Sequence, residues 1–378
     1  MKKLGLYIHI PFCKRKCYYC DFVSFSGKEK LIEQYINSLK QEIKKCKINK
    51  EEYQVKTIYF GGGTPSFINS SYITDIIKEL KQKFNISENA EITIEINPGT
   101  VDEQKLKDYY NAGINRISFG LQTTKSELLK LVGRIHSYSS FLEAYNLARK
   151  VGFKNINVDL MIGLPVQTIQ DIEEDLERII NLNPEHISVY SLIVEEGTKI
   201  EEKIDKKELY LPSEELERKM YWKVKEELEK NGYVHYEISN FAKKGFESKH
   251  NLACWNQEEY IGFGLAAHSY INNTRYSNTE NLEEYVTVGA DAPVRPQTTH
   301  EIQTKEDKMK EYMLLGLRKI EGIKISDFKN KFVENPIYLY RESLNKLVIQ
   351  ELIEIDIDNI KLTNKGIDLA NLVWEEFV

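Results

Sequence analysis

Three cysteines fall close together near the start of the chain, in the spacing Cys13-x3-Cys17-x2-Cys20. Thiolates this close in sequence can ligate one metal centre, but they are one ligand short of the four that an iron–sulfur cluster normally takes. A [4Fe–4S] cluster with three protein ligands has one open iron, and open positions are where metal sites do chemistry. The alternative is a zinc site completed by His9 or a distant histidine, although structural zinc sites more often show two separated C-x2-C pairs. We therefore expect a [4Fe–4S] cluster on these three cysteines.

The composition is that of an ordinary globular protein. The 378 residues are 41% hydrophobic and 29% charged, which excludes a disordered or collagen-like chain. The net charge of −6 gives no basic bias toward phosphate backbones, so no nucleic-acid partner is expected. No stretch approaches the roughly 18 apolar residues of a transmembrane helix.

The N-terminal apolar run lacks the features of a secretory signal. Residues 4–10 include His9 and then meet Pro11, with no small-residue cleavage site. The five cysteines are an odd number in a chain too long to need disulfides, which favours a reducing compartment. We expect a cytoplasmic protein, either free or peripherally bound to a membrane.

Apolar runs alternate with helical patterns through the first two-thirds of the chain. Strands are expected at 4–10, 55–60, 91–96, 116–119, 155–160 and 186–190. Helices are expected at 28–47, 71–84, 102–112, 125–132, 139–151, 169–181 and 214–231. This order predicts parallel strands joined by right-handed crossovers. We expect an α/β fold, a partial (β/α)6 barrel of the TIM type, with a doubly wound open sheet as the alternative.

The pattern changes after residue 235. A connector at 236–300 is rich in Gly, Asn and aromatic residues, and a separate module at 301–378 follows the barrel of 1–235. Helices at 305–319 and 338–350, short strands at 353–357 and 360–362, and a final helix predict a small winged-helix-like α+β module. From Glu351 onward the sequence contains seven acidic residues and only two basic ones, Lys361 and Lys365. We therefore expect a packing or partner module and not a DNA reader.

Candidate binding residues gather at the expected carboxyl ends of the strands, where barrels of this type place their active sites. They are Gly61, Gly62, Gly63, Thr64, Glu95, Gln122, Arg134 and Asp159. Each is weak evidence alone, because a triple glycine can be a tight turn and an arginine a surface ion pair. Because polar or glycine residues occur at the same end of several strands, together they indicate one binding site.

The C-x3-C-x2-C motif resembles that of the radical S-adenosylmethionine (SAM) superfamily. The resemblance implies that the open iron binds SAM and that an electron from the cluster cleaves it to a 5′-deoxyadenosyl radical. Five further segments resemble oxygen-independent coproporphyrinogen III oxidase and its relatives: 7–13 (YIHIPFC), 60–65 (FGGGTP), 95–98 (EINP), 118–122 (SFGLQ) and 157–165 (NVDLMIGLP). By that resemblance, SAM contacts Tyr7, Tyr19, Gly62, Gly63, Thr64, Glu95, Gln122, Arg134 and Asp159.

Two departures from the oxidase pattern favour the haem-chaperone branch of this family. Phe22 stands where the oxidase has a further cysteine, and the oxidase's N-terminal extension is absent here. The segment 236–242 (YEISNFA) is typical of the chaperone branch, and so is a haem motif H-N-x-x-Y-W. That motif here reads His250-Asn251-Leu-Ala-Cys254-Trp255, with cysteine in place of tyrosine.

The resemblance makes His250 and Asn251 haem-binding residues. His250 would be an axial ligand and Trp255 would stack on the macrocycle. Cys254 would be either a thiolate ligand or a small buried hydrophobe. We read His268 as a packing residue and Cys46 as a core residue.

Three hypotheses follow. The first is a haem chaperone that binds a [4Fe–4S] cluster, SAM and haem, and delivers haem to haem-requiring proteins. Such a protein would receive electrons from a donor such as flavodoxin or ferredoxin. It would also be able to form a dimer. The second is an enzyme that oxidatively decarboxylates coproporphyrinogen III. The third is a zinc-binding protein without redox chemistry.

Overall fold

Six parallel strands form the centre of the molecule. The computed structural model describes residues 1–288 and 297–378. The central strands are hydrogen-bonded in chain order, β1 (Lys2–Ile10), β2 (Tyr53–Gly62), β3 (Ile86–Ile96), β4 (Arg116–Gln122), β5 (Ile156–Ile162) and β6 (His186–Ser191). This order confirms the predicted partial barrel.

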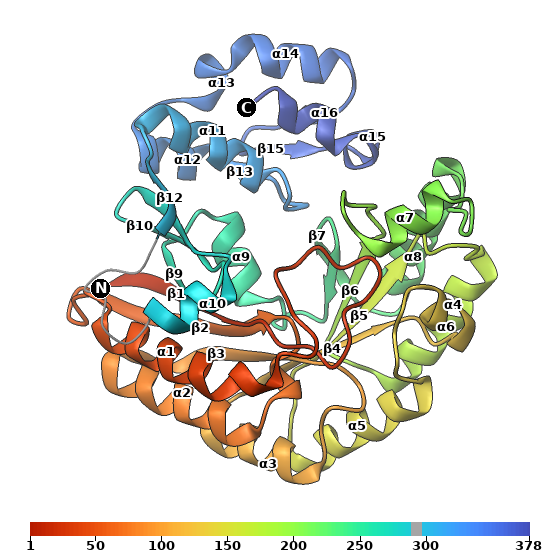
Figure 1. The fold of residues 1–378 in the computed structure, drawn as a ribbon. Helices are drawn as coiled ribbons and strands as arrows, with labels where there is room; N and C mark the ends of the chain where they lie inside the picture. Colours follow the sequence, from red (N-terminus) through yellow and green to blue (C-terminus); the bar gives the residue numbers. More distant parts are fainter. Residues whose placement is uncertain (289–296) are drawn as a thin grey trace.

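Helices connect the strands and line the outer, convex side of the curved sheet (Figure 1). They are α1 (Ile32–Lys45), α2 (Ser70–Lys83), α3 (Glu103–Ala112), α4 (Ser126–Leu131), α5 (Tyr138–Val151), α6 (Ile169–Leu182), α7 (Lys199–Asp205) and α8 (Glu214–Lys230). Helix α7 was not predicted, because its seven residues carry only two apolar side chains, Ile200 and Ile204, which are too few to show a helical period. The other helices match the predicted ranges to within a few residues.

Alternation along the strands separates an apolar face from a polar face. In β1 the even positions Leu4, Leu6, Ile8 and Ile10 are at most 1% exposed and belong to the core. The intervening Tyr7 and His9 point to the opposite face, because successive side chains of a strand alternate.

The polar positions of neighbouring strands lie side by side. Tyr7 of β1 pairs with Tyr59 of β2. Glu95 of β3 pairs with Ser118 of β4, which pairs with Asn157 of β5. The inner face of the barrel is therefore a continuous polar surface.

Residues after 231 extend the sheet at both edges. The strands β7 (Val234–Glu237) and β8 (Asn240–Ala242) lie beyond β6, and β9 (Tyr260–Phe263) pairs parallel with β1. The strands β10 (His268–Ile271), β11 (Thr274–Asn278) and β12 (Gln297–Ile302) continue outward from β9. Two helices belong to this part, α9 (Lys249–Trp255) and α10 (Leu282–Val288). Residues 289–296 of the predicted connector lie outside the described residues.

The C-terminal residues form a small module that sits apart from the helical rim of the barrel (Figure 1). Its helices are α11 (Lys305–Gly316), α12 (Ile325–Phe332), α13 (Pro336–Leu339), α14 (Arg341–Ile349), α15 (Asn364–Asp368) and α16 (Ala370–Glu375). Its three strands, β13 (Ile323–Lys324), β14 (Ile353–Ile355) and β15 (Asn359–Leu362), are antiparallel in the order β13-β15-β14. The predicted winged-helix-like α+β module is confirmed, with α12 as an additional helix.

No helix in the described part of the chain combines the length and the apolar composition that crossing a membrane requires.

Candidate functional site

A cavity of about 470 Å³ opens at the carboxyl ends of the central strands. Its volume is in the range of small-molecule sites. Most of the predicted site residues line it, namely Cys13, Cys17, Tyr19, Cys20, Gly62, Gly63, Thr64, Glu95, Gln122, Arg134 and Asp159. We call it the cysteine cavity.

The cysteine loop follows β1 and is tied back by backbone hydrogen bonds. The amide of Cys13 donates to the carbonyl of Phe25 at 2.8 Å. Cys13 is buried, and Cys17 and Cys20 are half-buried. Burial raises the pKa of the Cys13 and Cys20 thiols.

Two side chains point hydrogen-bond donors at the sulfurs. Arg134 Nη1 donates to Cys17 Sγ at 3.3 Å, and Thr64 Oγ1 donates to Cys13 Sγ at 3.5 Å. Donors of this kind tune the potential of cysteine-ligated clusters. Within the described residues, no three His, Cys, Asp or Glu side chains converge closely enough to hold a single metal ion. A four-iron cluster does not need such convergence, because each cysteine binds a different iron, and the three thiols that line one cavity fit it.

Two buried carboxyl groups face the same cavity. Glu95 accepts a hydrogen bond from the Tyr59 hydroxyl at 2.8 Å, and Asp159 accepts one from Asn157 Nδ2 at 2.6 Å. Burial raises the pKa of Glu95 to about 7, although the Tyr59 hydrogen bond opposes this rise. Burial also raises the pKa of Asp159. Both groups would be stabilised as carboxylates by an ammonium group or by ribose hydroxyls.

Polar atoms without partners mark where a polar ligand fits. The Oε1 atom of Gln122 and the Nε atom of Arg134 are buried and make no hydrogen bond within the described residues. Gln122 has a φ of 73°, a left-handed conformation that costs a non-glycine residue free energy and is typical of functional sites. Buried polar atoms are normally hydrogen-bonded, so these two indicate room for a ligand's polar groups.

The triple glycine after β2 makes room for neighbouring side chains. Gly62 has a φ of +108°, and a Cβ there would lie 2.6 Å from the His9 ring. A Cβ on Gly63 would lie 3.0 Å from Cys13 Sγ. Gly61 is not among the residues that line the cavity. Two of the three glycines therefore shape the site through His9 and Cys13.

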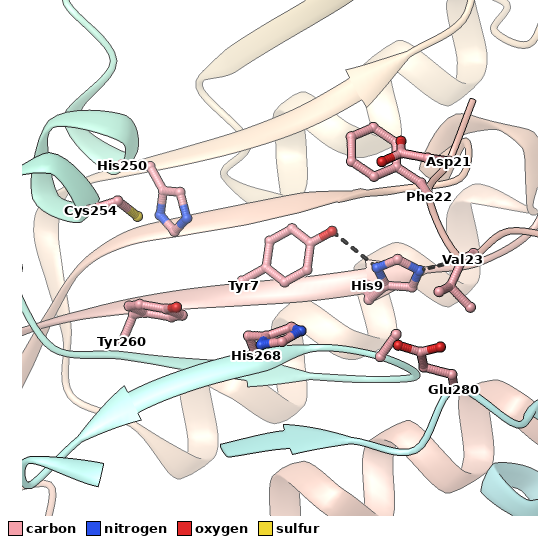
Figure 2. Close-up of a pocket in the computed structure, with 11 residues that line it drawn as sticks. Tyr7, His9, Asp21, Phe22, Val23, His250, Cys254, Tyr260, His268 and Glu280 are labelled. Carbon is pink, nitrogen blue, oxygen red and sulfur yellow. Dashed lines mark hydrogen bonds between the residues drawn. The ribbon is translucent and has the colours of Figure 1, made fainter. Parts of the chain in front are cut away.

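A second cavity of about 410 Å³ adjoins the first. Figure 2 shows it, with Tyr7 lying between His250 and His9. Its further lining residues are Asp21, Phe22, Val23, Cys254, Tyr260, Ala266, His268 and Glu280. Asp21 and Phe22 line both cavities, so the two are neighbours. We call this one the histidine cavity, and Tyr7 lies here and not in the cysteine cavity.

His250 is held from two sides and keeps one ring nitrogen free. Its Nδ1 atom is 2.9 Å from Thr57 Oγ1, and its ring stacks on Tyr59 with 5.2 Å between the ring centroids. Within the described residues its Nε2 atom has no hydrogen-bond partner. Burial lowers the pKa of His250 to about 4, so the ring is neutral near pH 7 and can ligate a metal.

The rest of the predicted haem motif is spread out. Cys254 lines the histidine cavity, and burial raises its thiol pKa to about 11, which keeps it protonated near pH 7. Asn251 is half-buried and lines neither cavity. Trp255 lines neither cavity either, and its ring lies 4.5 Å from the Arg318 guanidinium. The structure therefore gives Trp255 a protein partner in place of the predicted open stacking position.

The readings of His268 and Cys46 also need correction, and Tyr59 was missed. His268 was read as packing, but it is exposed and lines the histidine cavity. Cys46 is partly buried against the core and not inside it. Tyr59, which lines the cysteine cavity, was not singled out. The alternation of Thr57 and Tyr59 with the buried Ile58 was the available signal.

The fold and the three cysteines define a radical SAM protein. Residues 7–179 match the Radical SAM superfamily, and residues 303–369 match the HemN C-terminal domain. Membership of this superfamily implies a [4Fe–4S] cluster and SAM.

Similarity to individual proteins shows which family of this superfamily the chain belongs to. The chain is 37% identical to the heme chaperone HemW of Lactococcus lactis, over 100% of this chain and 98% of that protein. It is 38% identical to HemW of Bacillus subtilis, over 98% of both. The chain therefore belongs to the HemW family. The structure of coproporphyrinogen III oxidase (HemN) from Escherichia coli matches with a TM-score of 0.86 at 25% identity, over 100% of this chain and 90% of that one.

Proposed function

We propose that this chain is a haem chaperone, which holds a [4Fe–4S] cluster and SAM in the cysteine cavity and haem in the histidine cavity. It hands the haem to haem-requiring acceptor proteins. The observation that carries the proposal is His250, a neutral imidazole whose Nε2 atom has no hydrogen-bond partner among the described residues, in a cavity that adjoins the cysteine cavity. The full-length likeness to proteins named as heme chaperones supports it.

In the cysteine cavity, one set of residues binds the cluster and another set binds SAM. Cys13, Cys17 and Cys20 hold the cluster, which when bound supplies the electron for SAM cleavage. Arg134 offers a planar fork suited to a carboxylate, and Glu95 accepts from an ammonium group or a hydroxyl. The aromatic ring of Tyr19 packs beside these groups at the wall of the cavity.

A basic rim favours an acidic electron donor such as flavodoxin or ferredoxin. Lys14, Arg15 and Lys16 stand between the first two cysteines, and Lys14 and Arg15 are exposed. None of the three is ion-paired with an acidic side chain in the part of the chain that the structure describes. Charge complementarity of this kind speeds encounter and orients the partner.

The histidine cavity supplies the haem ligand. His250 Nε2 would bind the haem iron, and the exposed imidazole of His268 lies in the same cavity on β10. Cys254 stays protonated and packs as a neutral thiol.

The second candidate function is oxidative decarboxylation of coproporphyrinogen III. The match to the HemN structure over the whole chain favours it. Phe22, which is 62% exposed and lines both cavities, stands at the position where the oxidase pattern has a cysteine. We therefore prefer the chaperone.

The test uses protein reconstituted with iron and sulfide under anaerobic conditions. One sample is loaded with haem and mixed with a haem-free b-type cytochrome, and another receives coproporphyrinogen III, SAM and a reductant. The chaperone account expects haem transfer and no vinyl product, and a variant with Cys13, Cys17 and Cys20 changed to Ala should lose the cluster. Protoporphyrinogen formation without haem transfer would establish the enzyme instead.

A further inference from the structure

One side chain, Tyr59 of β2, lines the cysteine cavity and stacks on His250, which lines the histidine cavity. Its hydroxyl donates to Glu95 Oε1 in the cysteine cavity at 2.8 Å. Its ring stacks on His250 of the histidine cavity, with 5.2 Å between the centroids and 27° between the planes. Tyr59 therefore contacts both Glu95, a proposed SAM-binding residue, and His250, the proposed haem ligand.

Other residues of β2 and β3 also contact His250. Thr57, two residues earlier on the same face of β2, binds His250 Nδ1 at 2.9 Å. Glu91 of β3 accepts from the backbone amide of His250 at 3.1 Å. Tyr7 of the neighbouring strand β1 also stacks on Tyr59, with centroids 6.3 Å apart and planes 24° apart. A shift of Tyr59 cannot leave the imidazole unchanged, because both rings are in contact inside a packed wall.

The hydroxyl of Tyr59 is a dependable donor. A tyrosine hydroxyl has an ordinary pKa of about 10, and the hydroxyl of Tyr59 lies 2.8 Å from Glu95 Oε1. The phenol therefore stays protonated over the physiological range and donates to Glu95. A ligand group bound on Glu95 fixes the carboxylate, and through this hydrogen bond it also orders the Tyr59 ring.

We propose that Tyr59 is a positioning residue that couples the two sites, so that SAM bound in the cysteine cavity raises the affinity of the histidine cavity for haem. This inference rests on the proposed function. Ordering of the Tyr59 ring by the first ligand lowers the entropic cost of ordering His250 for the second, which gives positive cooperativity. Coupling between two sites is reciprocal, so haem raises the affinity for SAM by the same factor.

The experiment is a thermodynamic cycle on the reconstituted protein without reductant, so that SAM binds and is not cleaved. Haem affinity is measured from the Soret band with and without saturating SAM, and SAM affinity is measured by equilibrium dialysis with and without haem. The test variant is Tyr59→Phe, which keeps the stacked ring and removes only the hydroxyl. The matched control is Tyr109→Phe, because the Tyr109 hydroxyl is buried on α3 and has no hydrogen-bond partner within the described residues.

We expect SAM to raise the haem affinity of the wild type and of Tyr109→Phe by about fivefold or more, in line with typical coupling between sites. In Tyr59→Phe both ligands should still bind, while the coupling factor falls close to one. A second variant, Tyr59→Leu, removes the stacked ring as well, and should also shift the Soret band of bound haem.

Two results would overturn the inference while leaving the proposed function in place. One is a wild type that binds both ligands with no coupling, and the other is full coupling retained in Tyr59→Phe. Failure of the wild type to bind haem at all would instead refute the proposed function, and the coupling with it.

Discussion

At the scale of single residues, the inner face of the barrel concentrates groups that are unfavourable to bury. Glu95, Asp159, Gln122 and Arg134 all present polar atoms to one cavity. Burial raises the pKa of both carboxyl groups, and Gln122 adopts a left-handed backbone. Such departures cluster at functional sites, where a ligand completes the missing interactions.

Glu95→Gln should stabilise the ligand-free protein above pH 7. Burial raises the pKa of Glu95 from 4.5 to about 7. The folded state therefore binds more protons than the unfolded state between these values, and the stability present below pH 4.5 is lost as the pH rises through about 7. Urea unfolding at pH 8 should show a gain of about 2 kcal/mol in the free energy of unfolding.

The control for this change is Glu88→Gln, at an exposed position of the same strand β3. It should leave the pH dependence of unfolding as in the wild type. In Glu95→Gln the affinity for SAM at pH 8 should fall, because the carboxylate acceptor is gone. Parallel stability curves for the wild type and Glu95→Gln from pH 4.5 to 8 would contradict the assigned environment.

At the scale of elements, apolar runs that alternate with helical patterns predicted the six parallel strands. The signal is local, because most residues of each run are buried, as in β4 and β5. The cysteine cavity was predictable for the same reason, since the ends of parallel strands meet at one edge.

Contacts between distant elements were not predictable from such a pattern. Trp255 of α9 meets Arg318, which follows α11, and no spacing in the sequence relates the two. The exposure of His268 depends on how β10 pairs with β9 and β11. The position of His250 beside Thr57 and Tyr59 likewise follows from α9 packing against β2.

The end of β2 provides a test of local packing. Gly62→Ala should destabilise the fold by about 3 kcal/mol, because the new Cβ would combine a left-handed backbone with a contact of 2.6 Å to the His9 ring. Gly27→Ala is the control, since Gly27 has a φ of +74° but nothing within 4 Å of a Cβ. It should cost about 1 kcal/mol. Equal losses for the two variants in urea unfolding would show that the His9 contact does not constrain this turn.

At the scale of the whole molecule, the C-terminal module is fastened to the helix that carries His250. The Arg318 guanidinium lies 4.5 Å from the Trp255 ring of α9 and 4.9 Å from the Trp374 ring of α16. The backbone also joins the two parts, since the amide of Ile238 donates to the carbonyl of Arg318 at 3.1 Å. The module therefore helps to set the position of α9.

Arg318→Met should loosen this attachment. Loss of two desolvated cation–π contacts should lower the free energy of unfolding by about 2 kcal/mol and change the tryptophan fluorescence. Arg318→Lys keeps the charge without the planar stack, so it should recover only part of the loss. Wild-type unfolding and fluorescence in Arg318→Met would show that the stack does not hold the module.

The most direct test of the whole account is a haem titration of the wild type and His250→Ala, followed at the Soret band, with His300→Ala as an exposed control on β12. We expect saturable haem binding by the wild type and by His300→Ala. In His250→Ala we expect an affinity lower by about tenfold or more, because loss of an imidazole bond to the haem iron would cost more than about 1.4 kcal/mol. A titration of His250→Ala that superimposes on that of the wild type would contradict the account.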